Sequence, residues 1–146
     1  MSDPVASARV ELRQKAERAA RRLSRDPRVA LVFLFGSVEA PGSSPPGDLD
    51  LGVWTQPALG LDELMRLRAD LALEFQAPID LVSLNDASVV LAYEVAESGR
   101  CLFARTPDAE TEFVVRARAR FWDFRPYREE QWRLTAERLE ERRLGP

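Results

Sequence analysis

The sequence predicts one α/β (α+β) domain in which helices flank a small mixed β-sheet. Short apolar runs typical of buried strands alternate with longer segments in which apolar residues recur every three or four positions, as they do along one face of a helix. The chain has 146 residues, of which 45% are hydrophobic, and this is enough to bury the core of one domain.

The first part of the chain is expected to hold two helices and three strands. Asp3-Pro4 starts a helix of about 20 residues, because aspartate caps a first turn and proline fits the first helical position. Pro78 ends the second helix and precedes the third strand. The ranges expected after the first helix are a strand over 29–35, a strand over 48–55, a helix over 61–75 and a strand over 79–84.

The remaining residues are expected to form three helices and one strand. Asn85 or Asp86 caps a helix that ends near Ser98, where Gly99 supplies a left-handed C-terminal residue. The elements expected after it are a short strand over 100–104, a helix from about residue 106 with Phe113 and Ala117 along one face, and a final amphipathic helix over 126–143.

Composition excludes several kinds of chemistry. Histidine is absent, so no Ser-His-Asp or Cys-His arrangement can form, and Cys101 alone allows neither an intrachain disulfide nor a cysteine zinc site. Any metal must therefore bind to oxygen, which favours Mg²⁺ or Mn²⁺. The chain has no apolar run long enough for a membrane span and no signal-peptide pattern, so we expect a cytoplasmic protein with no membrane partner.

Three aspartates interrupt the apolar strand segments, where a carboxylate is costly. Asp48 and Asp50 project from one face of the second strand, about 7 Å apart at their Cβ atoms, and the apolar residues between and after them face the other way. Asp80 lies between two apolar residues of the third strand. Such a cluster can hold a pair of divalent cations and repels itself without them. The alternative is that each aspartate sits at a strand end and faces water.

Gly36 and Ser37 directly follow the first strand. A glycine at this turn lets a phosphate approach the backbone, and the serine hydroxyl with successive N–H groups can bind anionic oxygens. Many tight turns contain Gly-Ser, so the pair is informative because it stands eleven residues before Asp48.

The order of these motifs resembles a known family. Gly-Ser, about ten residues, Asp-x-Asp-Leu and a later Asp-Leu-Val are similar to the nucleotidyltransferase superfamily with a polymerase-β-like core. Within it, the chain resembles the minimal nucleotidyltransferase (MNT) group, whose members are often antitoxins paired with HEPN-domain ribonucleases. The resemblance runs from Val29 to about Tyr127. It suggests a single nucleotidyltransferase domain (1–146) with an N-terminal helix (1–28), a catalytic core (29–105) and a C-terminal helical extension (106–146).

The resemblance implies a Mg²⁺-dependent transfer of AMP from ATP to a hydroxyl group, which in paired antitoxins is a tyrosine hydroxyl of the toxin. Asp48 and Asp50 would bind two Mg²⁺ ions, and Asp80 would share one of them and help to deprotonate the hydroxyl. Gly36 and Ser37 would hold the β and γ phosphates. The implied partners are ATP and a HEPN toxin in a hetero-oligomer, and no direct nucleic-acid binding is expected.

The loop between the motifs departs from the family pattern. Where the family has Arg-Gly and then a serine directly before the first aspartate, this chain has Ala40, Pro41 and Gly47. The lost arginine and hydroxyl bear on turnover and leave the metal carboxylates unchanged. Two alternatives stay open: an antitoxin that neutralises its partner by binding alone, and a transferase that acts on an antibiotic or RNA.

Aromatic and basic residues interleave near the C-terminus. Such a surface suits a protein partner or a nucleic acid, and the alternative is a helical pair that docks on its own sheet. The residues are Phe121, Trp122, Phe124, Tyr127 and Trp132, with Arg118, Arg120, Arg125, Arg128 and Arg133 among them.

Overall fold

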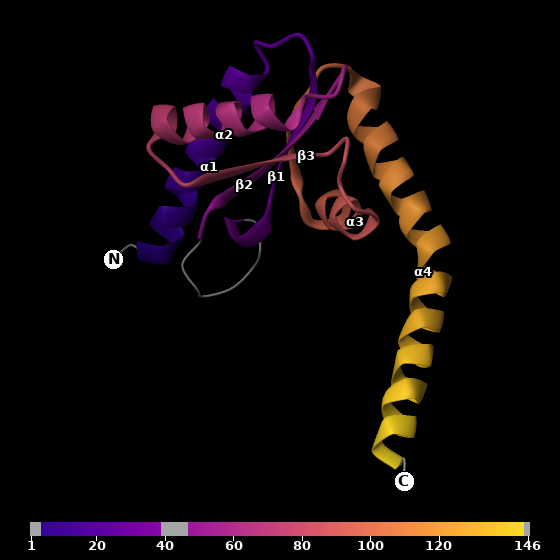
Figure 1. The fold of residues 1–146 in the computed structure, drawn as a ribbon. Coiled ribbons are helices and arrows are strands. Elements are labelled where there is room, and N and C mark those ends of the chain that lie inside the picture. Colours follow the sequence, from indigo (N-terminus) through magenta and orange to yellow (C-terminus); the bar gives the residue numbers. More distant parts are fainter. Residues whose placement is uncertain (1–3, 39–46, 145–146) are drawn as a thin grey trace.

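The computed structural model describes residues 4–38 and 47–144. Its strands form one mixed sheet whose order is third, second, first and fourth, and the predicted α/β class with helices around a small mixed sheet is confirmed (Figure 1). The elements are α1 (Pro4–Leu23), β1 (Val29–Phe35), the 3₁₀ helix η1 (Gly36–Val38), β2 (Leu49–Thr55), α2 (Leu61–Phe75), β3 (Ile79–Ser83), α3 (Val89–Ser98), β4 (Arg100–Ala104) and α4 (Pro107–Leu144).

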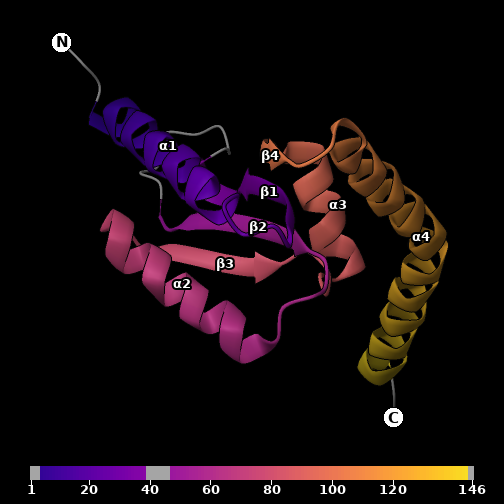
Figure 2. The same ribbon diagram turned by 90° about the horizontal axis from the view of Figure 1, so that it is seen from above.

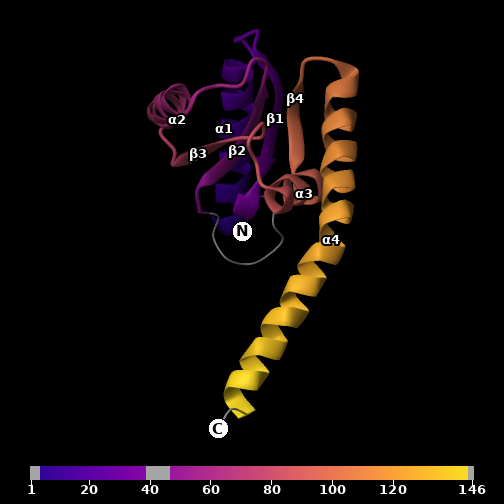
Figure 3. The same cartoon turned by 45° about the vertical axis from the view of Figure 1, so that its right-hand side comes forward.

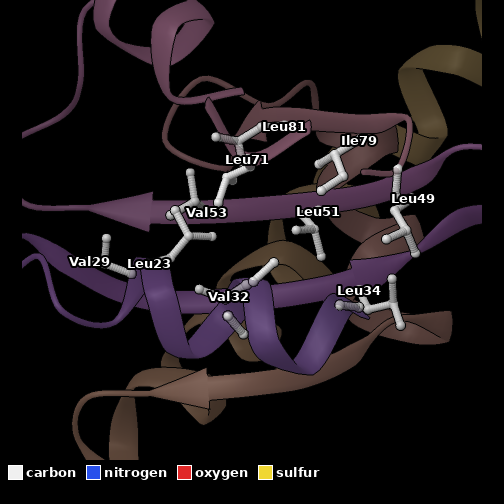
Figure 4. Packing of buried hydrophobic residues seen from close by; sticks show 14 of the residues in the cluster. Leu23, Val29, Val32, Leu34, Leu49, Leu51, Val53, Leu71, Ile79 and Leu81 are labelled. Atoms are coloured by element: carbon white, nitrogen blue, oxygen red, sulfur yellow. The ribbon is translucent and has the colours of Figure 1, made fainter. Parts of the chain in front are cut away.

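One face of the sheet is aliphatic and is covered by α1 and α2 (Figure 2). Side chains alternate along a strand, so Leu49, Leu51 and Val53 of β2 all point to this face, where they are buried (Figure 4). Small residues such as Ala16 and Ala20 let α1 approach the sheet closely. Each large aliphatic side chain buried here contributes about 1.5–3 kcal/mol through the hydrophobic effect.

The other face is partly aromatic and is covered by α3 and the first half of α4. Phe33 of β1 and Phe113 of α4 meet with their ring centroids 5.2 Å apart. Asp50 alternates with Leu49 and Leu51 along β2, so it falls on this second face, at the end of the sheet next to η1, and Asp48 directly precedes the strand. This placement leaves them near the rim of the core.

The C-terminal region differs from the two helices expected, because α4 is a single helix with Pro126 inside it. Proline lacks the N–H of one helical hydrogen bond and its ring crowds the preceding turn, which bends a helix without having to end it. Figure 3 shows α4 changing direction along its length, with its second half leaving the rest of the molecule. Trp132 in this second half is 68% exposed. The alternative in which the C-terminal helices dock on their own sheet is therefore wrong for this half. Within the described residues, no helix has an apolar stretch long enough to cross a membrane.

Three local predictions are also corrected. β2 begins at Leu49, so Asp48 precedes the strand. Ser88, and not Asn85 or Asp86, caps α3, since its hydroxyl accepts a hydrogen bond from the Leu91 N–H at 3.1 Å. Asn85 instead bridges the backbone of Thr55, accepting from its N–H and donating to its carbonyl. Gly99 is extended (φ −80°), and glycine is needed there because a Cβ would lie 2.5 Å from the Val95 carbonyl oxygen.

Candidate functional site

The sheet register brings Asp50 and Asp80 together. Asp50 of β2 stands opposite Asp80 of the parallel strand β3 and opposite Phe35 of β1. Residues that are paired across neighbouring strands point to the same face of the sheet. Asp48 lies two residues earlier and is exposed. The three predicted aspartates therefore lie at one end of the sheet, at the end where η1 follows β1.

Gly36 forms a close contact with Asp50. Its φ of +82° is in the left-handed region, which strongly favours glycine. A Cβ built on Gly36 would clash with the Asp50 carboxylate and would lie 3.0 Å from its Cγ. The turn therefore brings the backbone of η1 directly beside Asp50. Ser37 follows in η1, and its side chain lies outside what the structure describes.

Asp50 lies in an environment that disfavours its charge. Partial burial raises the pKa of the Asp50 carboxyl group, and the negative charges of Asp80, Asp48 and Glu94 raise it further. Glu94 comes from α3, and the sequence analysis did not single it out because its position depends on how α3 packs on the sheet. A group of carboxylates suits a hard divalent cation such as Mg²⁺, which binds oxygen ligands.

The three aspartates do not converge on one point. Among residues 4–38 and 47–144, no three carboxylate or thiol side chains are close enough together to hold a single metal ion. The Asp80 Oδ1 atom instead lies 3.3 Å from the Nη1 atom of Arg68 on α2, and the Arg68 Nε–H donates to the Ile79 carbonyl at 3.3 Å. Arg68 is a second residue that the sequence analysis missed. Asp80 thus faces Asp50 across the two strands and is also paired with a cation from α2.

Basic side chains from α1 reach the end of η1. Arg9 and Arg13 donate hydrogen bonds to the Val38 carbonyl, at 3.1 and 3.3 Å. Ala40 and Pro41, where the family pattern has its arginine and glycine, lie outside the described residues, whereas Gly47 is described and exposed. Positive charge near the predicted phosphate turn therefore comes from the first helix.

The family is decided by a match that covers this site. The family described as "Polymerase beta, Nucleotidyltransferase" matches residues 17–108, which include Gly36, Asp48, Asp50 and Asp80. This chain belongs to the polymerase β nucleotidyltransferase family. The family predicted from the motifs is confirmed.

Two related proteins are similar to this chain in sequence or in structure. Over 84 residues the chain is 31% identical to Protein adenylyltransferase MntA of Shewanella oneidensis, a match that spans 58% of this chain and 60% of that protein. A chain from the structure of a tri-AMPylated S. oneidensis HEPN toxin in complex with MNT antitoxin is 26% identical, with a TM-score of 0.71 over 84% of this chain and 98% of that chain.

A chain from the structure of a toxin–antitoxin with AMP-PNP is also 26% identical, with a TM-score of 0.73 over 82% of this chain and 98% of that chain. The chain is thus homologous in sequence and structure to MntA, the antitoxin of MntA–HepT pairs.

Proposed function

We propose that this chain is a Mg²⁺-dependent nucleotidyltransferase that transfers AMP from ATP to a hydroxyl group, most simply a tyrosine hydroxyl, of a HEPN ribonuclease toxin, and so acts as its antitoxin. The observation that carries the proposal is the pairing of Asp50 with Asp80 beside the Gly36 turn, with Asp48 two residues away. The relative named a protein adenylyltransferase and the related chains solved with a HEPN toxin and with AMP-PNP support it.

In this proposal the aspartates would hold the metal and the turn would hold the nucleotide. Asp48 and Asp50 would bind two Mg²⁺ ions, or Mn²⁺ in their place, and Asp80 would share one of them. Such ions would supply positive charge against the triphosphate. The backbone at Gly36 and Ser37 receives the β and γ phosphates.

Transfer then needs a proton acceptor. The hydroxyl oxygen attacks the α-phosphorus, the bond from that phosphorus to pyrophosphate breaks, and Asp80 accepts the hydroxyl proton. Arg68, 3.3 Å from Asp80, orients that carboxylate. Arg9 and Arg13 place positive charge at the phosphate turn, where the loop of this chain lacks an arginine.

A second candidate is an antitoxin that binds its toxin without modifying it. Two observations favour this reading: the aspartates do not converge on a single ion within the described residues, and Ala40, Pro41 and Gly47 depart from the family pattern. Binding alone would need the fold and a partner surface but not the carboxylates.

Intact mass spectrometry separates the two candidates. A candidate HEPN-domain partner is incubated with the chain and Mg²⁺·ATP, and the reaction is repeated with the Asp48→Asn/Asp50→Asn variant. We expect mass increments of whole adenylate units on the HEPN protein with the wild-type chain and none with the variant. An unchanged toxin mass in a complex that still forms would contradict transfer and support the binding-only antitoxin.

A further inference from the structure

A pocket lies at the opposite end of the sheet from the aspartates. Its volume is about 270 Å³, and it is lined by the start of β1, the end of β2 and the turn from β4 into α4. Figure 1 shows this turn at the upper end of the sheet and η1 at the lower end. Among the described residues of the candidate nucleotide site, none of Gly36, Asp48, Asp50 and Asp80 lines the pocket.

The inner wall of the pocket is apolar and largely aromatic. Leu31 and Phe113 are buried, and the half-buried Trp54 packs edge-on against Phe113 with the ring centroids 6.3 Å apart. These rings are fixed by the core behind them, since Phe113 also contacts Phe33. A flat apolar group can therefore enter without rearranging the wall.

Arg105 supplies a fixed positive charge at the rim. Its Nε–H donates to the Val29 carbonyl at 2.8 Å, and its Nη2 atom donates to the carbonyls of Ser24 and Asp26 at 2.7 and 3.0 Å. The three acceptors are neutral carbonyl oxygens that orient the guanidinium. The nearby Asp26 carboxylate, whose pKa the Arg105 charge helps to lower, offsets part of that charge.

Arg116 supplies a second cation that is more adaptable. Its guanidinium lies 5.8 Å from the centroid of the Trp54 ring, and its side chain is exposed. Among the described residues its side chain forms neither an ion pair nor a hydrogen bond. Glu112 also lines the pocket, and the third lining arginine, Arg28, is engaged by Asp26 and Glu63. Within the part of the chain that the structure describes, neither Arg105 nor Arg116 has a carboxylate within ion-pair distance, although Asp26 lies close enough to Arg105 to interact with its charge.

We infer that this pocket is a binding site for a small planar aromatic ligand that carries an anionic group. The ring lies against Trp54 and Phe113, and the anionic group accepts hydrogen bonds from Arg116 while Arg105 contributes its charge. The site is separate from the nucleotide site, and the inference does not depend on the proposed function.

Two matched probes test the ligand class. Isothermal titration with 2-naphthoate should show saturable binding at millimolar concentration or tighter, whereas 2-naphthylmethylamine, a similar ring with a cationic group, should bind at least about tenfold more weakly. Equal binding of the two probes would overturn the anionic specificity, and the absence of naphthoate binding would overturn the site.

Variants test the location. Arg116→Gln should weaken naphthoate binding about tenfold or more, because a charge-assisted hydrogen bond is lost. Arg120→Gln, an exposed position one turn further along α4 and outside the pocket lining, should leave it unchanged, and so should Asp50→Asn. Unchanged binding in Arg116→Gln, or its loss in Asp50→Asn, would overturn the assignment to this pocket. Both arginines are exposed, and a thermal unfolding curve for each variant verifies that it folds.

Discussion

On one face of β2, Leu49, Leu51 and Val53 are buried against α1 and α2, whereas on the other face Asp50 and Trp54 are only partly buried. The same seven-residue strand therefore contributes stability through one set of side chains and chemistry through the other. Alternation of side chains allows this, because a costly carboxylate on one face does not disturb the packing on the opposite face. Substitutions on the aliphatic face should therefore lower stability, whereas substitutions on the other face should change the behaviour of the candidate site.

The largest effect is expected from the aliphatic face. Leu51→Ala should lower the free energy of unfolding by about 2–5 kcal/mol, since Leu51 is fully buried and its truncation leaves a cavity in the main core. Urea unfolding measures it. Leu73→Ala on α2 is the matched control, because Leu73 is 79% exposed and should change stability by less than about 0.5 kcal/mol. Similar losses in both variants would contradict the burial of Leu51 in the main core.

The second-largest effect is expected from the turn beside Asp50. Gly36→Ala should cost about 1–3 kcal/mol of stability, because φ of +82° strains an alanine and its Cβ clashes with the Asp50 carboxylate. Gly60→Ser is the control, since a Cβ there meets no atom within 4 Å and serine caps α2 well. If the Gly36→Ala variant unfolds at the same urea concentration as the wild type, this description of the turn is contradicted.

Asp50→Asn should stabilise the protein at pH 7 when no divalent cation is present. Burial and the neighbouring carboxylates raise the pKa of Asp50 in the folded protein, so the folded state binds a proton more readily than the unfolded state. The wild type therefore loses stability as the pH rises from the ordinary aspartate pKa of 3.8 through the raised value. The gain in the variant should be full above the raised pKa and shrink as the pH falls toward 3.8.

Thermal unfolding across this pH range measures the Asp50 effect, with the exposed Asp70→Asn on α2 as control. Mg²⁺ at ten times its dissociation constant should stabilise the wild type by about 1.4 kcal/mol, and removal of the ion with EDTA should reverse the effect. The Asp50→Asn variant should not respond. An asparagine variant that is less stable than the wild type at pH 7 without cations would refute this account of Asp50.

The smallest effect is expected far from β2. Trp132→Ala should leave the free energy of unfolding within about 0.5 kcal/mol of the wild type, because Trp132 is 68% exposed on the half of α4 that leaves the domain. Urea unfolding decides this, and a loss above about 1 kcal/mol would mean that the distal half of α4 packs on the domain in solution.

Much of the fold was predictable because it rests on local patterns. The apolar run at 29–35 and the spacing of Leu64 and Leu71 predict β1 and α2 with the bounds observed. The helix boundary predicted at Pro126 was wrong, because proline can bend a helix as well as end it, and which of the two happens depends on the residues around it. Ser88 was missed as a cap because Asn85 is an equally good capping type that is used elsewhere, on Thr55.

The candidate site was predictable in part. Asp48, Asp50 and Asp80 stand out because carboxylates are rare inside apolar runs, and the structure brings them to one end of the sheet. Arg68 and Glu94 carry no such signal, because charged residues are ordinary on helices and only the packing of α2 and α3 brings them to the aspartates. The pocket behind Trp54 was unpredictable for the same reason, as its arginines come from distant segments.

The central claim is that the end of the sheet that carries Asp48 and Asp50 is a metal–nucleotide site. The most direct test is an anomalous difference map from crystals grown with Mn²⁺ and AMP-PNP. The account predicts Mn²⁺ peaks at about 2.1–2.2 Å from carboxylate oxygens of Asp48 and Asp50, with the phosphates beside Gly36. Bound AMP-PNP elsewhere on the chain, or bound nucleotide here with no metal on either aspartate, would contradict it.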